Sequence, residues 1–251
     1  MAHKLSHNFK ILIEYDGTGF YGWQRQKDRP TVQGELEKVL GIILNQKITV
    51  SGSGRTDAGV HAFGQVANFH AQTSLDPDRI KKGVNSLIHQ PIVIKECRIT
   101  DKEFHAQYDA VSKEYHYFIL NREHGCAIGR QYQWHIKNSL DIHAMQACCD
   151  AATGIFDFSS FENTGSPRTS SVREVFFFTV DKVNTTRLVF KICASGFLKN
   201  MVRNLVGTIV LAGLNKITPE EFIRIRNAKD RTQAGPTAPA HGLFLKRVNY
   251  S

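Results

Sequence analysis

The residues best suited to chemistry lie in one short loop, residues 54–62, which reads GRTDAGVHA and sets Asp57 beside Arg55. A carboxylate presented from a tight loop can act as a nucleophile, a general base or a cation ligand. Glycines on both sides of the aspartate let a bulky planar substrate approach the backbone closely. Aspartate and glycine are also the commonest residues of ordinary turns, so the pattern alone leaves a purely structural loop as an alternative.

Hydrophobic periodicity predicts the elements that position this loop. Apolar residues at helical spacing over 31–45 predict an amphipathic helix, and Asp76 followed by Pro77 predicts the capped start of a second one. The strands expected in this half of the chain lie at 9–15, 48–50, 66–69 and 92–99.

The second half of the chain repeats this theme loosely. Helices are expected at 139–153 and 197–213, and a third begins at Thr218, where Glu221 completes a capping box. Strands are expected at 113–120, near 172–181, at 187–194 and at 243–248. Because strands and helices alternate without a proline- or serine-rich linker, we expect an α/β fold with helices covering one face of a continuous sheet.

The composition is that of an ordinary globular protein, with 41% hydrophobic and 22% charged residues over 251 positions. Lysine and arginine number 32 against 23 acidic residues, which gives a formal net charge of +9. This surplus favours a polyanionic partner such as RNA, and a merely basic enzyme is the alternative. The positive residues are scattered through the segments expected to fold, which favours a broad groove over a disordered basic arm.

Cysteine and histidine usage predicts a reduced intracellular protein without a metal. The five cysteines form no Cys-x-x-Cys pair, and the eleven histidines form no metal-ligand cluster. The first seven residues contain no apolar signal region, and no apolar run is long enough to cross a bilayer. We therefore expect a cytoplasmic protein that needs no cofactor, no metal and no membrane.

Five motifs, of which the aspartate loop is one, resemble those of the tRNA pseudouridine synthase A family in the same order. The other four are residues 15–24 (YDGTGFYGWQ), 113–117 (KEYHY), 197–204 (FLKNMVRN) and the pair 234–239 (AGPTAP) and 242–245 (GLFL). They span nearly the whole chain, so chance explains them poorly. The resemblance implies the pseudouridine synthase fold: two RNA-recognition-like subdomains, here 1–107 and 108–251, that share a mixed, mostly antiparallel sheet with a central RNA cleft.

The resemblance also implies the activity. Family members isomerise uridine to pseudouridine at nucleotides 38, 39 and 40 of the tRNA anticodon stem-loop, act as homodimers and use no cofactor. Asp57 matches their catalytic nucleophile. It can add to C6 of the uracil, attack C1′, or take the C2′ proton, and the sequence leaves these three routes open.

Two further residues match catalytic positions of the family. Arg203 matches the arginine beside the aspartate, where a guanidinium would keep Asp57 ionised and oriented. The alternative is that Arg203 faces solvent at its helix end. Tyr115 matches the tyrosine that stacks on the substrate and takes part in proton transfer from C5, although Tyr115 and Tyr117 also suit the core of a strand.

The remaining candidates concern binding of the RNA. Arg55 matches an arginine that helps to extrude the target base, and anchoring of its own loop is the alternative. Arg25 belongs to a basic cluster suited to phosphates. Leu243 or Leu245 is expected to line the uracil pocket, since strand alternation puts both on one face. Residues 121–135 and 155–175 contain none of the five motifs, and their role is left open.

Two other readings stay open. One is a catalytically idle RNA-binding protein with the same fold and basic cleft, which intact Asp57, Tyr115 and Arg203 argue against. The other is a small-molecule isomerase or hydrolase that uses Asp57 as its nucleophile.

Overall fold

The computed structural model describes residues 6–165 and 169–251, which divide into two compact units. One unit runs to Val111 and also contains Leu245–Ser251, and the other is Ser112–Phe244. The chain passes between them inside two strands, β5 (Ala110–Asn121) and β10 (Leu243–Tyr250). The subdomains expected at 1–107 and 108–251 stay a prediction. Residues 1–5, in the stretch expected to lack a signal region, and 166–168, within the segment 155–175 whose role the sequence leaves open, lie outside the described residues.

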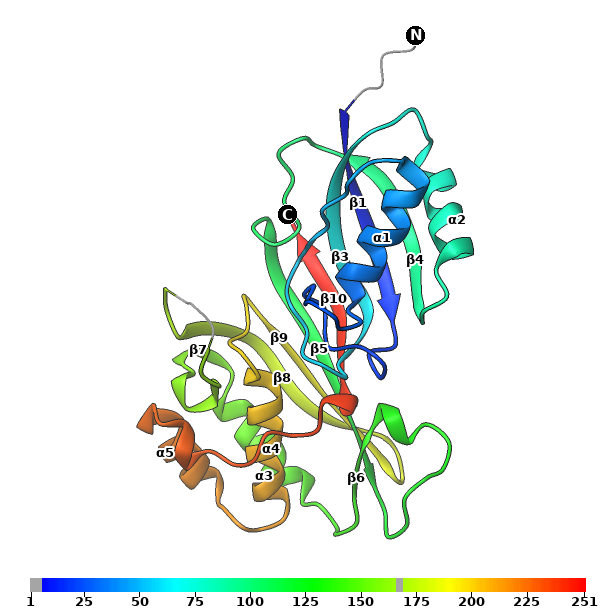
Figure 1. The fold of residues 1–251 in the computed structure, drawn as a ribbon. Helices are drawn as coiled ribbons and strands as arrows, with labels where there is room; N and C mark the ends of the chain where they lie inside the picture. The colour runs from blue at the N-terminus through cyan, green and yellow to red at the C-terminus, as the bar shows by residue number, and fades with distance from the viewer. Residues whose placement is uncertain (1–5, 166–168) are drawn as a thin grey trace. The chain divides into compact units, whose positions relative to one another are not determined.

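The first unit packs two helices on one face of an antiparallel set of strands (Figure 1). Its strands are β1 (Ser6–Tyr15), β2 (Ser51–Gly52), β3 (His61–Gln72) and β4 (Ile92–Thr100). Strand β1 pairs with both β3 and β4, and β2 pairs with β3. Helices α1 (Val32–Leu44) and α2 (Pro77–Leu87) begin after the caps Thr31 and Asp76. The alternation predicted for β1 is confirmed, because Phe9, Ile11 and Ile13 are buried.

The strand predicted at 48–50 is wrong. Ile48 and Val50 are buried as their apolar character requires, but side chains of α1 take the place of a neighbouring strand. The Val50 N–H donates to Glu37 Oε1 at 3.0 Å, and Gln33 Nε2 donates to the Val50 carbonyl at the same distance. Since buried backbone groups need a hydrogen-bond partner of any kind, two helix side chains satisfy this segment without a ladder.

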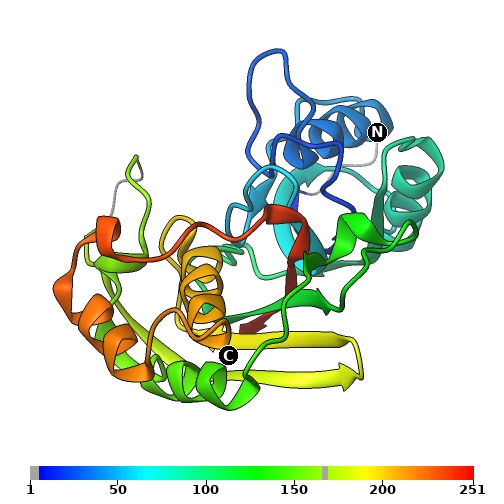
Figure 2. The same ribbon diagram turned by 90° about the horizontal axis from the view of Figure 1, so that it is seen from below.

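The second unit is built on antiparallel strands in the order β5–β9–β8–β7, with β6 added parallel to β5. These further strands are β6 (Trp134–Ile136), β7 (Gly154–Asp157), β8 (Val172–Asn184) and β9 (Arg187–Ala194). The helices are α3 (Ile142–Ala151), α4 (Met201–Gly213) and α5 (Pro219–Ala228). Short 3₁₀ turns lie at Arg130–Tyr132, Ser159–Phe161, Arg231–Gln233 and Ala240–Gly242. Helix α3 packs against β8 and against α4 (Figure 2).

The other predicted elements are present, with some shifted ends. The capping box of Thr218 and Glu221 starts α5 as predicted. Helix α4 begins at Met201 rather than at residue 197, because its N-cap Asn200 has a left-handed φ of 62°. Strands β6 and β7 were not predicted, since each is only three or four residues long.

The predicted α/β class, with mostly antiparallel strands, is confirmed. We also predicted that the two units share a sheet and enclose a central cleft. Both statements concern the arrangement of the units and stay predictions. Among the described residues, no helix is long and apolar enough to cross a membrane.

Candidate functional site

The candidate residues are divided between the two units. The first unit contains Asp57, Arg55, Arg25 and Leu245, and the second contains Tyr115, Arg203 and Leu243. Within each unit the structure shows what holds every candidate side chain in place. The pairing of Asp57 with Arg203 joins residues of different units and stays a prediction.

The backbone on both sides of Asp57 is fixed by residues 15–24, the opening motif. Before the aspartate, buried Thr56 shares a 2.8 Å hydrogen bond with the Tyr15 hydroxyl, and its carbonyl accepts from the Trp23 N–H at 3.1 Å. After it, the Gly59 N–H donates to the Phe20 carbonyl at 3.3 Å, and the Val60 N–H donates to the Asp57 carbonyl at 3.1 Å and closes a turn. Half-buried Asp57 therefore stands on a constrained loop rather than on a mobile one.

Two glycines of the opening motif allow this close contact. Gly22 has a φ of +89°, and a Cβ on it would lie 2.5 Å from the Thr56 carbonyl oxygen. A Cβ on Gly17 would lie 2.1 Å from the carbonyl oxygen of Val60. Only glycine permits such approaches of one backbone to another. The opening motif is thus the platform on which the aspartate loop rests.

Gly22→Ala is expected to lower the free energy of unfolding by about 1–3 kcal/mol, because it combines a left-handed φ with a backbone clash. Urea denaturation measures this loss. Gly19→Ala is the matched control, since Gly19 belongs to the same motif and nothing lies within 4 Å of its Cβ position. An equal loss in both variants would mean that the contact with Thr56 is unimportant.

Trp23 belongs to the core of the first unit. Its side chain is 2% exposed, and its ring lies so close to Gly52 that a Cβ there would be 2.5 Å away. The Tyr15 ring also belongs to this core. It is buried, and burial raises the pKa of its hydroxyl. Both aromatic residues pack beneath the aspartate loop inside the core, so neither ring is exposed for stacking on a ligand.

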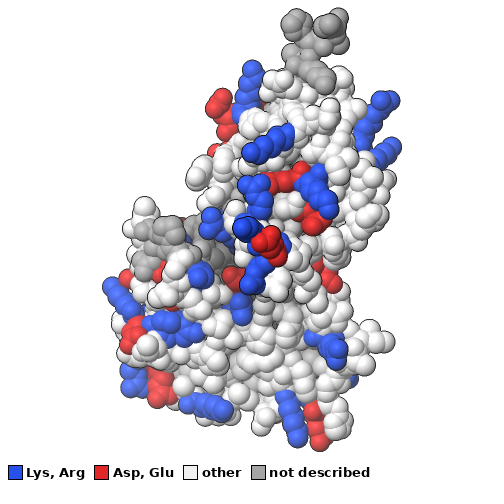
Figure 3. All heavy atoms as spheres, viewed as in Figure 1, with Lys and Arg blue, Asp and Glu red and all other residues white. Residues whose placement is uncertain are grey.

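The two candidate arginines of the first unit are exposed and held by polar side chains. Arg25 Nη1 donates to Glu37 Oε2 at 2.6 Å while its side chain remains 57% exposed. Arg55 Nε donates to Gln24 Oε1 at 3.1 Å, so its described anchor is a side-chain amide rather than a backbone carbonyl. Figure 3 shows basic side chains interleaved with acidic ones on the face that it presents. Both arginines keep donors directed towards solvent.

Tyr115 and Tyr117 occupy the inward side of β5 in the second unit. Tyr115 is 8% exposed and meets Phe197 edge-on, with ring centroids 5.1 Å apart. Tyr117 is fully buried, and its hydroxyl donates to the Pro239 carbonyl at 2.8 Å. Burial raises the pKa of Tyr117, against a smaller opposite effect of Arg203. Tyr117 is therefore a core residue, as expected.

Arg203 lies in the first turn of α4 and is clasped by one residue of the AGPTAP motif. Its Nε donates to the Ala238 carbonyl at 2.7 Å, and the Ala238 N–H donates back to the Arg203 carbonyl at 3.1 Å. The half-buried side chain thus has a set direction, which argues against a loose arginine in solvent. Nearby His241 has a lowered pKa, chiefly because of burial and further because of the Arg203 charge.

Burial does not distinguish the two leucine candidates. Leu243, Phe244 and Leu245 are all less than 7% exposed, so β10 is covered on both faces at this point. Strand alternation still places the two leucines on one side.

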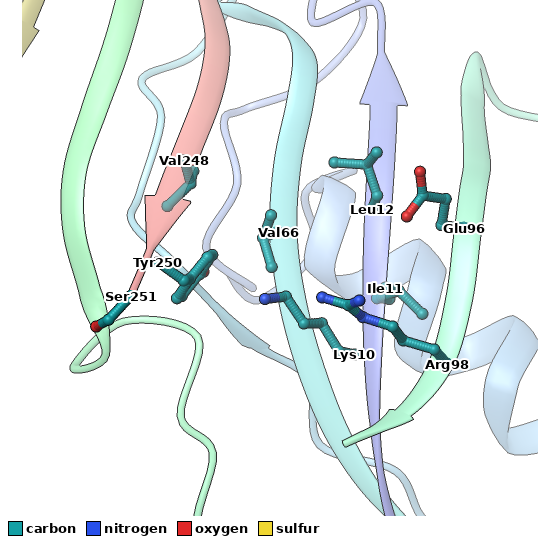
Figure 4. Close-up of a pocket in the computed structure, with 9 residues that line it drawn as sticks. All are labelled: Lys10, Ile11, Leu12, Val66, Glu96, Arg98, Val248, Tyr250 and Ser251. Carbon is teal, nitrogen blue, oxygen red and sulfur yellow. The ribbon is translucent and has the colours of Figure 1, made fainter. Parts of the chain in front are cut away.

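A hollow of about 350 Å³ in the first unit lies on the strand face away from the helices (Figure 4). Lys10 and Arg98 extend side by side from neighbouring strands into it. The Lys10 ammonium lies 3.7 Å from the centre of the Tyr250 ring, and burial, followed by the charge of Arg98, lowers its pKa. None of the candidate residues lines this hollow. Across the described residues, no group of three or more His, Cys, Asp or Glu side chains could hold a metal ion.

Sequence reasoning missed the groups that hold the candidates in place. The Trp23 N–H and the Ala238 carbonyl belong to the backbone and have no signature in the side-chain pattern. The Tyr15 hydroxyl, which hydrogen-bonds to Thr56 Oγ1, is likewise indistinguishable in the sequence from any other strand tyrosine. The only available signal was that each of these residues falls within one of the five motifs.

Comparison with known proteins gives consistent matches. A family model described as tRNA pseudouridine synthase matches residues 11–109 and 149–251. A tRNA pseudouridine synthase A of Thermoanaerobacter sp. (strain X514) is 41% identical over 97% of this chain and 99% of its own length. One from Acetivibrio thermocellus is 40% identical with the same coverage. A chain in the crystal structure of the archaeal box H/ACA sRNP Nop10–Cbf5 complex matches 90% of this chain and 60% of its own length, with 12% identity and a TM-score of 0.37.

Proposed function

This chain belongs to the tRNA pseudouridine synthase A family, and we propose that it acts on uridines 38, 39 and 40 of the tRNA anticodon stem-loop with Asp57 as nucleophile. The family's activity is the isomerisation of uridine to pseudouridine in tRNA, so the protein is an isomerase. The proposal concerns which nucleotides are modified and which side chains act on them.

The reaction replaces the bond between the ribose and N1 of the uracil by a bond between the ribose and C5. The N1–C1′ bond of uridine breaks, the base turns, C5 bonds to C1′, the C5 hydrogen leaves as a proton and N1 gains one. The atoms balance without an oxidant, a reductant or a phosphate donor. The protein has to supply a nucleophile, a proton acceptor for C5 and a pocket that holds the detached uracil.

The observation that carries the proposal is the construction of the aspartate loop. Asp57 is half-buried between Thr56, which the opening motif holds at two atoms, and a turn closed by Val60. A fixed carboxylate meets the attacking atom without first losing conformational freedom, and such preorganisation contributes much of the rate of enzymatic reactions. In the proposed mechanism Asp57 attacks C6 or C1′, or takes the C2′ proton.

The second unit supplies the remaining chemical groups in this proposal. Arg203 keeps Asp57 ionised and directed through charge-assisted hydrogen bonds. Tyr115 stacks on the uracil and accepts the C5 proton. Its low exposure and its edge contact with Phe197 support a ring held in one orientation. Leu243 of this unit, or Leu245 of the first unit, provides the apolar wall of the pocket.

The exposed arginines serve the RNA in the proposal. A uridine inside a base stack has to be flipped out before its atoms can be reached. Arg55, two residues before Asp57 and tethered only through a side-chain amide among its described contacts, enters the vacated space. Arg25 contacts phosphates with the part of its guanidinium that Glu37 leaves exposed.

We further propose a cytoplasmic homodimer that binds tRNA across both subunits. A net charge of +9 on each chain favours association with a polyanion of this size.

Tritium release from tRNA that carries 5-tritiated uridine tests the proposed specificity. Pseudouridylation replaces the C5 hydrogen by carbon, so each modified uridine releases its label to water. We expect release from a tRNA with uridines at 38, 39 and 40, and none from the same tRNA with other bases at all three.

Two other outcomes would favour the other readings. Tight tRNA binding without release would favour an idle RNA-binding protein. Release from free tritiated UMP would favour a small-molecule isomerase.

A further inference from the structure

The AGPTAP segment, residues 234–239, forms a strap across helix α4. A Cβ on Gly207 would lie 1.8 Å from the Pro236 carbonyl oxygen, so the strap touches the helix backbone itself. The Gly235 N–H donates to Thr208 Oγ1 at 2.9 Å. At its end the strap meets Arg203 through both polar backbone groups of Ala238. The position of the Ala238 carbonyl therefore depends on how the strap is held.

One arginine, Arg231, holds the strap with three of its five hydrogen-bonding contacts and ties it to Asn204 and Asn163 with the other two. Arg231 Nη1 donates to the carbonyls of Ala234 and Gly235 at 3.4 and 3.0 Å, and Nη2 donates to Thr237 Oγ1 at 3.1 Å. The other Nη2 bond goes to Asn204 Oδ1 and the Nε bond to Asn163 Oδ1, both at 3.0 Å. A guanidinium has five N–H groups, and these five contacts use all of them. In the described part of the chain, all five acceptors are neutral.

Asn204 fixes this arrangement to the helix. It is fully buried beside Arg203, and its Nδ2 donates to the Phe161 carbonyl at 2.8 Å and to Asn163. Its Oδ1 accepts from Arg231 and, at 2.7 Å, from Thr237 Oγ1. Arg231 can only donate, so the amide can take only one of its two orientations. A buried network satisfied at each member has one geometry, and a missing member leaves several groups unpaired.

We propose that Arg231, acting with Asn204 through the strap, is a positioning residue for the Arg203 guanidinium. It fixes Thr237 and thereby the Ala238 carbonyl that accepts from Arg203 Nε. This inference rests on the proposed role of Arg203 beside Asp57. Arg231 itself touches neither substrate nor reacting atoms in this scheme.

Arg231→Lys is the first test, because lysine keeps the charge but cannot span five acceptors. We expect kcat of tritium release to fall about 10²-fold while KM for tRNA changes less than about threefold, the effect of misplacing a catalytic group by about 1 Å. Thr237→Val removes one hydroxyl without changing the volume much. It is expected to cost about tenfold in kcat, and it keeps the test valid if Arg231→Lys folds poorly.

Arg226→Lys is the matched control. Arg226 is a second arginine of the same unit, which donates to the Ala151 carbonyl and lies 3.6 Å from the centre of the Phe156 ring. It has no described bond to the strap. We expect Arg226→Lys to lower stability to a similar degree and to leave kcat within about twofold.

A double-mutant cycle separates positioning from general support of the fold. If Arg231 acts through Arg203, Arg231→Lys should cost less than about twofold in an Arg203→Ala background. The same loss in both backgrounds, or a loss of tRNA affinity as large as the loss of kcat, would overturn the proposal. The rate of the wild-type protein tells failure of the proposed function apart from failure of the proposed role of Arg231. An inactive wild type contradicts the function, whereas an active wild type with an equally active Arg231→Lys variant contradicts the role of Arg231.

Discussion

Asp57→Asn is expected to abolish tritium release from tRNA, with a fall in kcat of about 10⁴-fold or more, the size seen when an enzyme loses its nucleophile. The amide has nearly the shape of the carboxylate but is hardly nucleophilic and accepts no proton at neutral pH. Affinity for tRNA should change less than about threefold, because the loop backbone is held by Thr56, Gly59 and Val60 and not by the Asp57 carboxylate alone. Single-turnover release and filter binding measure the two quantities.

Asp28→Asn is the matched control for this change. Asp28 is exposed in the neighbouring loop and has a φ of 56°, a conformation that asparagine adopts at least as readily as aspartate. It removes the same charge from the same unit and should leave turnover at the wild-type rate. Full turnover in Asp57→Asn would mean that the carboxylate is not the nucleophile, whatever the loop resembles.

The sequence predicted the elements well where a local rule determines them. Asp76 and Thr218 cap helices at the expected places, since each accepts from a backbone N–H within three residues along the chain. The strand expected at 48–50 failed because its hydrogen-bond partners, Gln33 and Glu37, come from a helix more than ten residues away. Hydrophobic periodicity predicts which side chains are buried, and Ile48 and Val50 are buried as it indicates. It does not predict which group forms hydrogen bonds with their backbone.

The candidate site shows the same limit. The motifs point to Asp57 and Arg203 as candidates, but they do not show which groups hold these side chains in place. Gly22 against Thr56 and Ala238 against Arg203 are contacts between distant segments, made largely by backbone atoms. The only sign of such a contact in the sequence is a glycine, a proline or another small residue at the point of contact. That the AGPTAP motif packs as a strap across α4 follows from the structure and not from its sequence.

Arg203→Ala is expected to lower kcat by about 10²- to 10³-fold, the cost of losing a preorganised charge beside the reacting group. Its effect on tRNA affinity should stay within about threefold, because a half-buried guanidinium clasped by Ala238 is directed by the protein and not by the phosphates of the ligand. Arg203→Lys should recover only part of the rate, since lysine keeps the charge but loses the planar fork that binds the Ala238 carbonyl and that, in the proposal, also directs the Asp57 carboxylate. Rates of tritium release and tRNA dissociation constants, measured for both variants, provide the comparison.

Arg224→Ala controls for the loss of a positive charge. Arg224 lies on α5 of the same unit with its side chain 74% exposed, paired weakly with Glu221 at 3.7 Å. Exposed pairs of this kind contribute little to stability, so the control should fold and turn over like the wild type. If Arg203→Ala lost affinity and rate in equal measure, the arginine would be a binding residue, and the strap that holds it would serve RNA recognition rather than the orientation of Asp57. The split between rate and affinity therefore decides the chemical role of Arg203, which resemblance alone leaves as an analogy.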